Sequence, residues 1–84
     1  MSYDLFIRRG AQRELASLPA EAYARVKSAV RALSDSPRPS GSRKLVGRDG
    51  WRIRVGEYRV IYEIHDASNS VTVLHVGHRR DVYR

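Results

Sequence analysis

The sequence WRIRVGEYRVIYEI at residues 51–64 has the pattern of two paired β-strands. Apolar and polar residues alternate through WRIRV, and the alternation resumes in YRVIYEI, as expected for half-buried strands. Gly56 and Glu57 between them have the length of a two-residue hairpin loop, which places Arg54 directly opposite Arg59. One face of the predicted hairpin is therefore apolar and the other is cationic.

The cationic face is the main functional signal. It carries Arg52, Arg54 and Arg59, with Arg54 and Arg59 predicted to have Cβ atoms about 5 Å apart. Like charges in that position destabilise a hairpin, so the pair is expected where phosphate binds, unless Glu57 or Glu63 reaches over to neutralise it or the arginines fan apart into water. The opposite face, which should pack under helices, carries Trp51, Ile53, Val55, Tyr58, Val60 and Tyr62.

A further strand is predicted over residues 71–76. It should run antiparallel to residues 58–64, which returns the chain to the hairpin turn, where residues 77–84 read GHRRDVYR. A shift of one residue in its register would exchange its two faces. In either register, arginines, His78 and Tyr83 converge at one end of the sheet, a combination suited to phosphate contacts and base stacking on single-stranded RNA.

The residues before the hairpin predict one strand and two helices. Residues 3–7 alternate as a strand, and apolar spacings of three and four predict helices over residues 11–18 and 20–33. Proline and glycine interrupt residues 34–50, in which only 44–46 could form a short strand. The order β-α-α-β-β-β predicts one α+β domain of 84 residues, in which an antiparallel sheet carries an N-terminal helical hairpin on one face.

The composition narrows the class of protein. An apolar content of 42% argues against a disordered chain, and the absence of cysteine excludes disulfides and thiolate metal sites. Three scattered histidines show no metal-ligand spacing, and the chain has no glycine-rich phosphate loop or nucleophile elbow, so we expect no metal and no cofactor. With no signal peptide or spanning segment in the sequence, we expect a cytoplasmic protein that does not contact membranes.

The charge favours a polyanionic partner. Sixteen Lys and Arg residues against nine Asp and Glu give a formal net charge of +7, and only Lys27 and Lys44 are lysines. The planar fork of arginine donors suits phosphate, and a strongly basic small domain attracts polyanions over long distances. The alternative interpretation of the charge alone is a solubilising surface.

Several motifs taken together resemble the RelE branch of the RelE/ParE toxin superfamily. They are Lys44-Leu45, WRIRV at residues 51–55, GEYRVIY at 56–62 and HVGHRRDVY at 75–83. The most specific part is the G-x-Y-R-x-x-Y hairpin followed by V-G-x-R at a strand end and a terminal tyrosine. The resemblance extends over essentially the whole chain.

The resemblance implies the toxin of a toxin–antitoxin pair. Such toxins cleave mRNA in the decoding site of the ribosome by attack of the RNA 2′-hydroxyl, without metal, and a cognate antitoxin blocks them. By motif position, Arg59 is the hairpin arginine that stabilises phosphate charge, and Arg79 is the strand-end general acid or phosphate clamp. Tyr83 matches the terminal tyrosine that stacks on the substrate base.

One departure from the family affects the mechanism. Arg52 and Arg54 fall where RelE has two lysines, and arginine stays protonated in proteins, so neither can be the general base. His78 and Tyr83 are the candidates, and the ordinary pKa of histidine, about 6.5, favours His78. The predicted catalytic residues are Arg59, Arg79, His78 and Tyr83, and the predicted RNA-binding residues are Arg52, Arg54, Lys44 and Arg80.

Two other functions remain open from the sequence. A ParE-like toxin would poison DNA gyrase by protein binding, although such members usually lose the set Arg59, Arg79, His78 and Tyr83. A catalytically silent module would only bind the antitoxin and regulate its own operon. Nothing in the sequence demands self-association.

Overall fold

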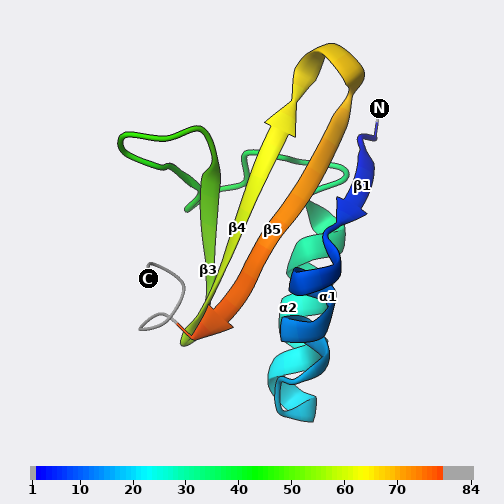
Figure 1. Ribbon diagram of the computed structural model, residues 1–84, viewed down its shortest axis with the longest axis vertical. Coiled ribbons are helices and arrows are strands. Elements are labelled where there is room, and N and C mark those ends of the chain that lie inside the picture. Colours follow the sequence, from blue (N-terminus) through cyan, green and yellow to red (C-terminus); the bar gives the residue numbers. More distant parts are fainter. Residues whose placement is uncertain (1, 79–84) are drawn as a thin grey trace.

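The computed structural model describes residues 2–78, which form two α-helices and five β-strands (Figure 1). The elements are β1 (Asp4–Ile7), α1 (Arg9–Ala16), α2 (Ala20–Ala32), β2 (Arg43–Lys44), β3 (Trp51–Val55), β4 (Tyr58–His65), a 3₁₀ turn (Asp66–Ser68) and β5 (Ser70–His78). The predicted α+β class is confirmed, and every predicted helix and strand is present. The short strand comprises residues 43–44 rather than the expected 44–46.

The strands form one mixed sheet in the order β1-β5-β4-β3-β2. Neighbouring strands are antiparallel except for β1, which pairs in parallel with β5, with Asp4 opposite Ser70. The prediction of an antiparallel sheet is therefore wrong for this pair. The reason is topological: both helices and three strands separate β1 from β5, so no hairpin turn imposes an antiparallel direction.

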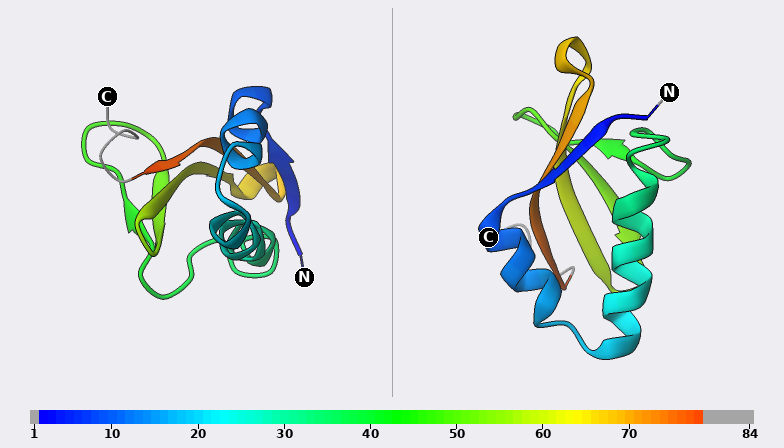
Figure 2. Two further views of the ribbon diagram at one scale, coloured as in Figure 1. Left: turned by 90° about the horizontal axis from the view of Figure 1, so that it is seen from below. Right: turned by 90° about the vertical axis from the view of Figure 1, so that its right-hand side faces the viewer.

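Both helices cover the same face of the sheet (Figure 2). The buried core between them and the sheet comprises Ala11, Leu15, Val26, Val30, Leu33, Ile53, Val60, Tyr62, Val71, Val73 and Val76. The predicted apolar face of the hairpin is confirmed, because Ile53, Val60 and Tyr62 are buried there. Within residues 2–78, neither helix is both long and apolar enough to cross a bilayer.

The pairing of β4 with β5 contains a bulge. Ile61 lies opposite His75, but the next residue, Tyr62, lies opposite Val73, so Leu74 is an extra residue in β5. The alternation of β5 therefore changes face midway, and neither of the two registers considered from the sequence holds along the whole strand. Ile61 and Leu74 are buried but lie outside the core cluster.

Candidate functional site

The β3–β4 hairpin places three arginines on the face of the sheet away from the helices. Arg54 lies directly opposite Arg59, which confirms the register predicted from the two-residue turn. The Nε atom of Arg54 donates to the carbonyl oxygen of Gly56 at 3.4 Å, whereas the Nε atom of Arg59 is buried. The Arg54 side chain is thus turned toward the hairpin loop, and the Arg59 side chain is packed against the protein.

Glu63 does not occupy the position in which it would neutralise this pair. Its Oε1 atom lies 3.4 Å from Nε2 of His65, at the other end of β4 from the hairpin turn. The alternative in which Glu63 reaches over the arginines is therefore not what the structure shows.

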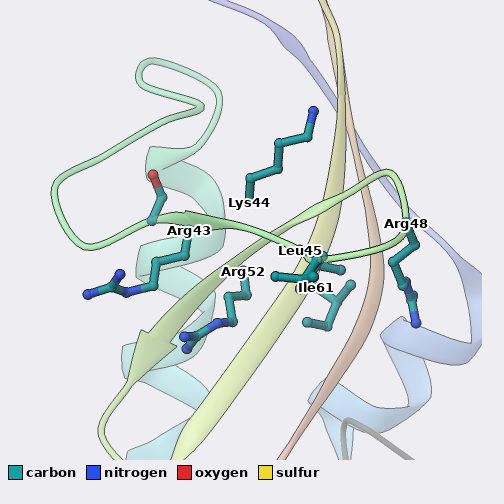
Figure 3. Close-up of a pocket in the computed structure, with 8 residues that line it drawn as sticks. Arg43, Lys44, Leu45, Arg48, Arg52 and Ile61 are labelled. Carbon is teal, nitrogen blue, oxygen red and sulfur yellow. The ribbon is translucent and has the colours of Figure 1, made fainter.

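A groove of about 710 Å³ lies beside the arginines on the same side of the sheet (Figure 3). We call it the basic groove; its lining residues are Ser42, Arg43, Lys44, Leu45, Val46, Arg48, Arg52 and Ile61. All charged residues that line it are cations. Leu45 and Ile61 supply an apolar surface between Arg43 and Arg52 on one side and Arg48 on the other.

Sequence reasoning selected Lys44 for this region and missed Arg43 and Arg48. Arg43 lies opposite Arg52, and Lys44, which lies opposite Trp51, also lines the basic groove. Figure 3 shows the Lys44 ammonium group pointing away from the guanidinium groups of Arg43 and Arg52. The role of Lys44 in RNA binding stays a prediction.

His78 lies at the same end of the sheet as Arg59 but does not share its face. It lies opposite Tyr58, while Arg59 lies opposite Gly77. The rings of His78 and Tyr58 meet edge to face, with centroids 5.9 Å apart and an interplanar angle of 79°. Because Tyr58 packs against the core cluster, His78 is on the side of the sheet that carries the helices.

The remaining predicted site residues, Arg79, Arg80 and Tyr83, lie outside the described residues 2–78. They follow β5 directly. The last two described residues, Gly77 and His78, are the partners of Arg59 and Tyr58.

A polar network ties residues 34–50, which carry part of the basic groove, to the rest of the protein. Arg38 Nη2 donates to Asp66 Oδ2 at 2.9 Å, and the Tyr3 hydroxyl donates to Asp66 Oδ1 at 2.7 Å. These two hydrogen bonds hold the pKa of Asp66 below its ordinary value. The Arg38 guanidinium also lies 5.2 Å from the centroid of the Trp51 ring, a cation–π contact.

The other two histidines lie close to carboxylates. His65 is beside Glu63, and His75 Nδ1 lies 3.8 Å from Glu14 Oε1 of α1. The same Glu14 oxygen accepts a hydrogen bond from the backbone N–H of Val76 at 3.1 Å, which links α1 to β5. In the part of the chain that the structure describes, no three potential ligand side chains are grouped to hold a metal ion.

Comparison with known proteins gives consistent matches. A family model described as the ParE toxin of the type II toxin–antitoxin system parDE matches residues 5–83. Toxin RelG of Mycobacterium tuberculosis is 36% identical over 88 aligned residues, which cover 100% of this chain and 99% of that protein.

Solved structures of RelE proteins have the same fold. The RelE–RelB complex of Pyrococcus horikoshii contains a chain with a TM-score of 0.84 and 30% identity, covering 98% of this chain and 100% of that chain. A chain of the RelBE2 complex of Mycobacterium tuberculosis has a TM-score of 0.83 and 29% identity, covering 94% of this chain and 100% of that chain. The isolated Escherichia coli RelE toxin has a TM-score of 0.80 and 29% identity, covering 98% of this chain and 92% of that chain. The chain therefore belongs to the RelE/ParE superfamily of type II toxin–antitoxin toxins.

Proposed function

We propose that this chain is the toxin of a RelBE-type pair and acts as a ribosome-dependent mRNA endonuclease. The observation that carries the proposal is the direct opposition of Arg54 and Arg59 on the sheet face away from the helices. Two like charges in that position repel each other, and a phosphate bound between them would turn the repulsion into attraction on both sides.

The proposed reaction is transesterification within the RNA. The 2′-hydroxyl loses its proton to a base, its oxygen forms a bond to the adjacent phosphorus, and the bond from phosphorus to the 5′-oxygen breaks. The departing 5′-oxygen takes up a proton, which leaves a 2′,3′-cyclic phosphate and a 5′-hydroxyl end. Negative charge accumulates on the pentacoordinate phosphate, so preorganised cations contribute most where that phosphate sits.

Each arginine has a place in this scheme. Arg59, which is partly buried and so held in position, would stabilise the charge on the phosphate, and Arg54 would contact the same phosphate from β3. Arg52, with Arg80, would bind the RNA backbone further along. Arg79, the residue that follows β5 in the sequence, would act as general acid for the leaving group or clamp the phosphate.

The general base is reassigned in this proposal because of the position of His78. A side chain that packs on Tyr58 faces the helices and is turned away from a phosphate held at Arg59. Tyr83 then becomes the proposed proton acceptor as well as the stacking group; its ordinary pKa is about 10, so this role would need arginines at the site that favour the ionised form. His78 is proposed to support the end of β5.

Arg59→Gln tests the proposal directly. After brief expression, primer extension on cellular mRNA should show discrete cuts with 5′-hydroxyl ends for the wild type. Loss of one preorganised contact to transition-state charge should lower the cleavage rate by about 100- to 1,000-fold. Arg9→Gln, which removes the same charge from the exposed start of α1, should cleave normally. Equal cleavage by both variants would exclude the assigned role of Arg59.

Single-turnover cleavage on programmed ribosomes tests the base. Tyr83→Phe, which keeps the ring and loses the hydroxyl, should be severely slowed and should lose the pH dependence of the rate. His78→Gln should cleave at close to the wild-type rate with an unchanged pH profile. The opposite pattern would return the role of base to His78.

A gyrase-poisoning toxin is the second candidate, and the description of the matching family model as a ParE toxin favours it. It predicts filamentation and an SOS response on expression, with no cuts in mRNA. Cuts without an SOS response support the endonuclease instead. Neither phenotype would indicate a silent antitoxin-binding module.

A further inference from the structure

The basic groove begins where the proposed cleavage face ends. Ile61 follows Arg59 by two residues on β4, so both lie on the same face, about 7 Å apart along the strand. Arg52, opposite Ile61, connects the arginine face to the groove through β3. An RNA strand with one phosphate at Arg59 therefore reaches the groove with an adjacent nucleotide.

The floor of the groove is apolar and fixed in place. The Ile61 side chain is only 2% exposed although it lies on the face away from the helices, and Leu45 of the β2–β3 hairpin lines the same groove. Leu45 is itself held by its backbone N–H, which donates to the carbonyl oxygen of Gly50 at 3.0 Å. Val46 beside it is 98% exposed at the rim.

The cations stand on either side of this floor (Figure 3). Arg43 and Arg52 are cross-strand neighbours, and Arg48 projects from the hairpin loop on the other side. Within residues 2–78, none of these three side chains forms an ion pair. Their charges are therefore available to an external anion.

We propose that the basic groove binds one nucleotide of single-stranded RNA next to the scissile phosphate. The base lies on Leu45, beside the nearly buried Ile61, and the phosphates on its two sides contact Arg52 and Arg48. An apolar floor between separated guanidinium groups matches the alternation of base and phosphate in a polynucleotide. An acidic peptide would use the cations but has no regular apolar group between its charges. This inference rests on the proposed function, since it places the nucleotide by reference to the cleaved bond.

Binding can be measured without cleavage. A fluorescent 2′-O-methyl hexanucleotide has no free 2′-hydroxyl and so cannot be cut by the proposed reaction. Fluorescence anisotropy with the purified full chain gives its affinity, and a matched oligonucleotide with abasic positions reports the contribution of the bases. We expect the abasic form to bind the wild type about fivefold more weakly or worse.

Variants separate the floor from the cations. Leu45→Gln should bind the intact and abasic oligonucleotides equally. Val46→Ser, at a side chain too exposed to affect folding, should reduce the difference between them. Arg48→Gln should weaken both and lower the slope of log affinity against log salt by about 0.7, the contribution of one phosphate contact on a single strand. Arg9→Gln is the charge-matched control and should leave the affinity difference and the slope close to those of the wild type.

Three outcomes would overturn the inference. The first is equal binding of intact and abasic RNA by the wild type. The second is an Arg48→Gln variant that binds like Arg9→Gln. The third is a result in which binding of an acidic peptide, such as decaglutamate, depends on Leu45 and Arg48 but binding of RNA does not. That result would make the groove a protein-binding surface. Base-dependent binding in a protein that yields no mRNA cuts would support the groove and contradict the endonuclease, so the two proposals can fail separately.

Discussion

Tyr62 joins the core to the irregular segment that precedes β2. Its side chain is completely buried in the core cluster, and its hydroxyl donates to the carbonyl oxygen of Pro37 at 2.7 Å. Burial raises the pKa of Tyr62 to about 12, because the ionised phenolate would lose its hydration. A single phenol therefore both fills the core and anchors residues 34–50.

Replacement of Tyr62 by phenylalanine should destabilise the protein at neutral pH. The ring is kept, but the lost hydrogen bond should cost about 1–2 kcal/mol of unfolding free energy. The difference in unfolding free energy should shrink in alkali. Because the pKa of Tyr62 is higher in the folded than in the unfolded protein, the wild type loses about 1.4 kcal/mol of stability per pH unit between pH 10 and pH 12, and the phenylalanine variant does not. Urea unfolding of both proteins at pH 8 and pH 11 measures this. A constant difference between them would contradict the assigned pKa.

Asp66 gives the opposite pH dependence. Its pKa is lowered by hydrogen bonds from Arg38 and Tyr3, so its contribution to stability is present above the unfolded pKa of about 3.9 and is lost as pH falls through the lower folded value. Asp66→Asn should therefore lower the Tm at pH 7, and the difference from the wild type should disappear in acid. Thermal melting from pH 7 to pH 2 checks this, with Asp4→Asn on the exposed end of β1 as a control.

The β2–β3 hairpin depends on glycines with positive φ angles. Gly47 has φ of 76° and Gly50 has φ of 135°, conformations that other L-residues rarely adopt. A Cβ atom at Gly50 would also lie 3.1 Å from Cδ1 of Leu45. The glycine therefore determines where the apolar floor of the basic groove is placed.

Gly50→Ala should thus affect both stability and the groove. Backbone strain at this position should cost about 1–3 kcal/mol, and displacement of Leu45 should weaken the binding of intact RNA more than that of abasic RNA. Gly10→Ala is the matched control, because it lies in α1 with no atom within 4 Å of the added methyl group and should be stabilising by about 0.5–1 kcal/mol. Chemical denaturation and the anisotropy assay together test both effects. Unchanged base dependence in Gly50→Ala would argue that Leu45 does not form the floor.

The elements and the central hairpin could be predicted because their signals are local. Alternation, helical spacing and a two-residue turn lie within a few residues of each other, and they determine the opposition of Arg54 and Arg59. The direction of β1 and the bulge in β5 depend on contacts between residues far apart in the chain, which periodicity does not report. The face of the sheet on which His78 lies was not predicted for the same reason, because it depends on the pairing of β4 with β5.

The site was predicted in part for a related reason. Arg52, Arg54 and Arg59 follow from the hairpin, whereas Arg43 and Arg48 lie in a segment with no periodic pattern. Only the folding of the β2–β3 hairpin over Ile61 brings them to the same groove. Arg79, Arg80 and Tyr83 stay predictions.

The net charge of the molecule, +7, suits two classes of partner, RNA and an acidic antitoxin. RelE chains from Pyrococcus horikoshii and Mycobacterium tuberculosis, which share the fold, have been solved in complexes with antitoxin. A small groove of about 380 Å³ between the helices and β1, lined mainly by apolar side chains such as Leu15 and Tyr23, adds a second surface.

A neutralising partner should therefore be encoded beside this chain. We expect a small protein with an acidic, partly disordered C-terminal segment that folds around the toxin, because a basic surface favours coupled folding and binding of such segments. Co-expression should restore growth and yield a complex on purification, with the complex weakening as salt rises. If no adjacent gene product bound, this result would count heavily against the proposed role as the toxin of such a pair.

The parallel pairing of β1 with β5 has a consequence for the order of folding during synthesis. Asp4 leaves the ribosome before its partner Ser70, which lies 66 residues further along the chain. Until then, β1 has no neighbour in the sheet, because β5 is the only strand it pairs with among those described. Small domains fold more slowly as their contacting residues lie further apart in the chain, so a pairing of this separation is expected to slow folding. The sheet of a nascent toxin therefore lacks this pairing while the chain is still attached to the ribosome, which is its proposed target.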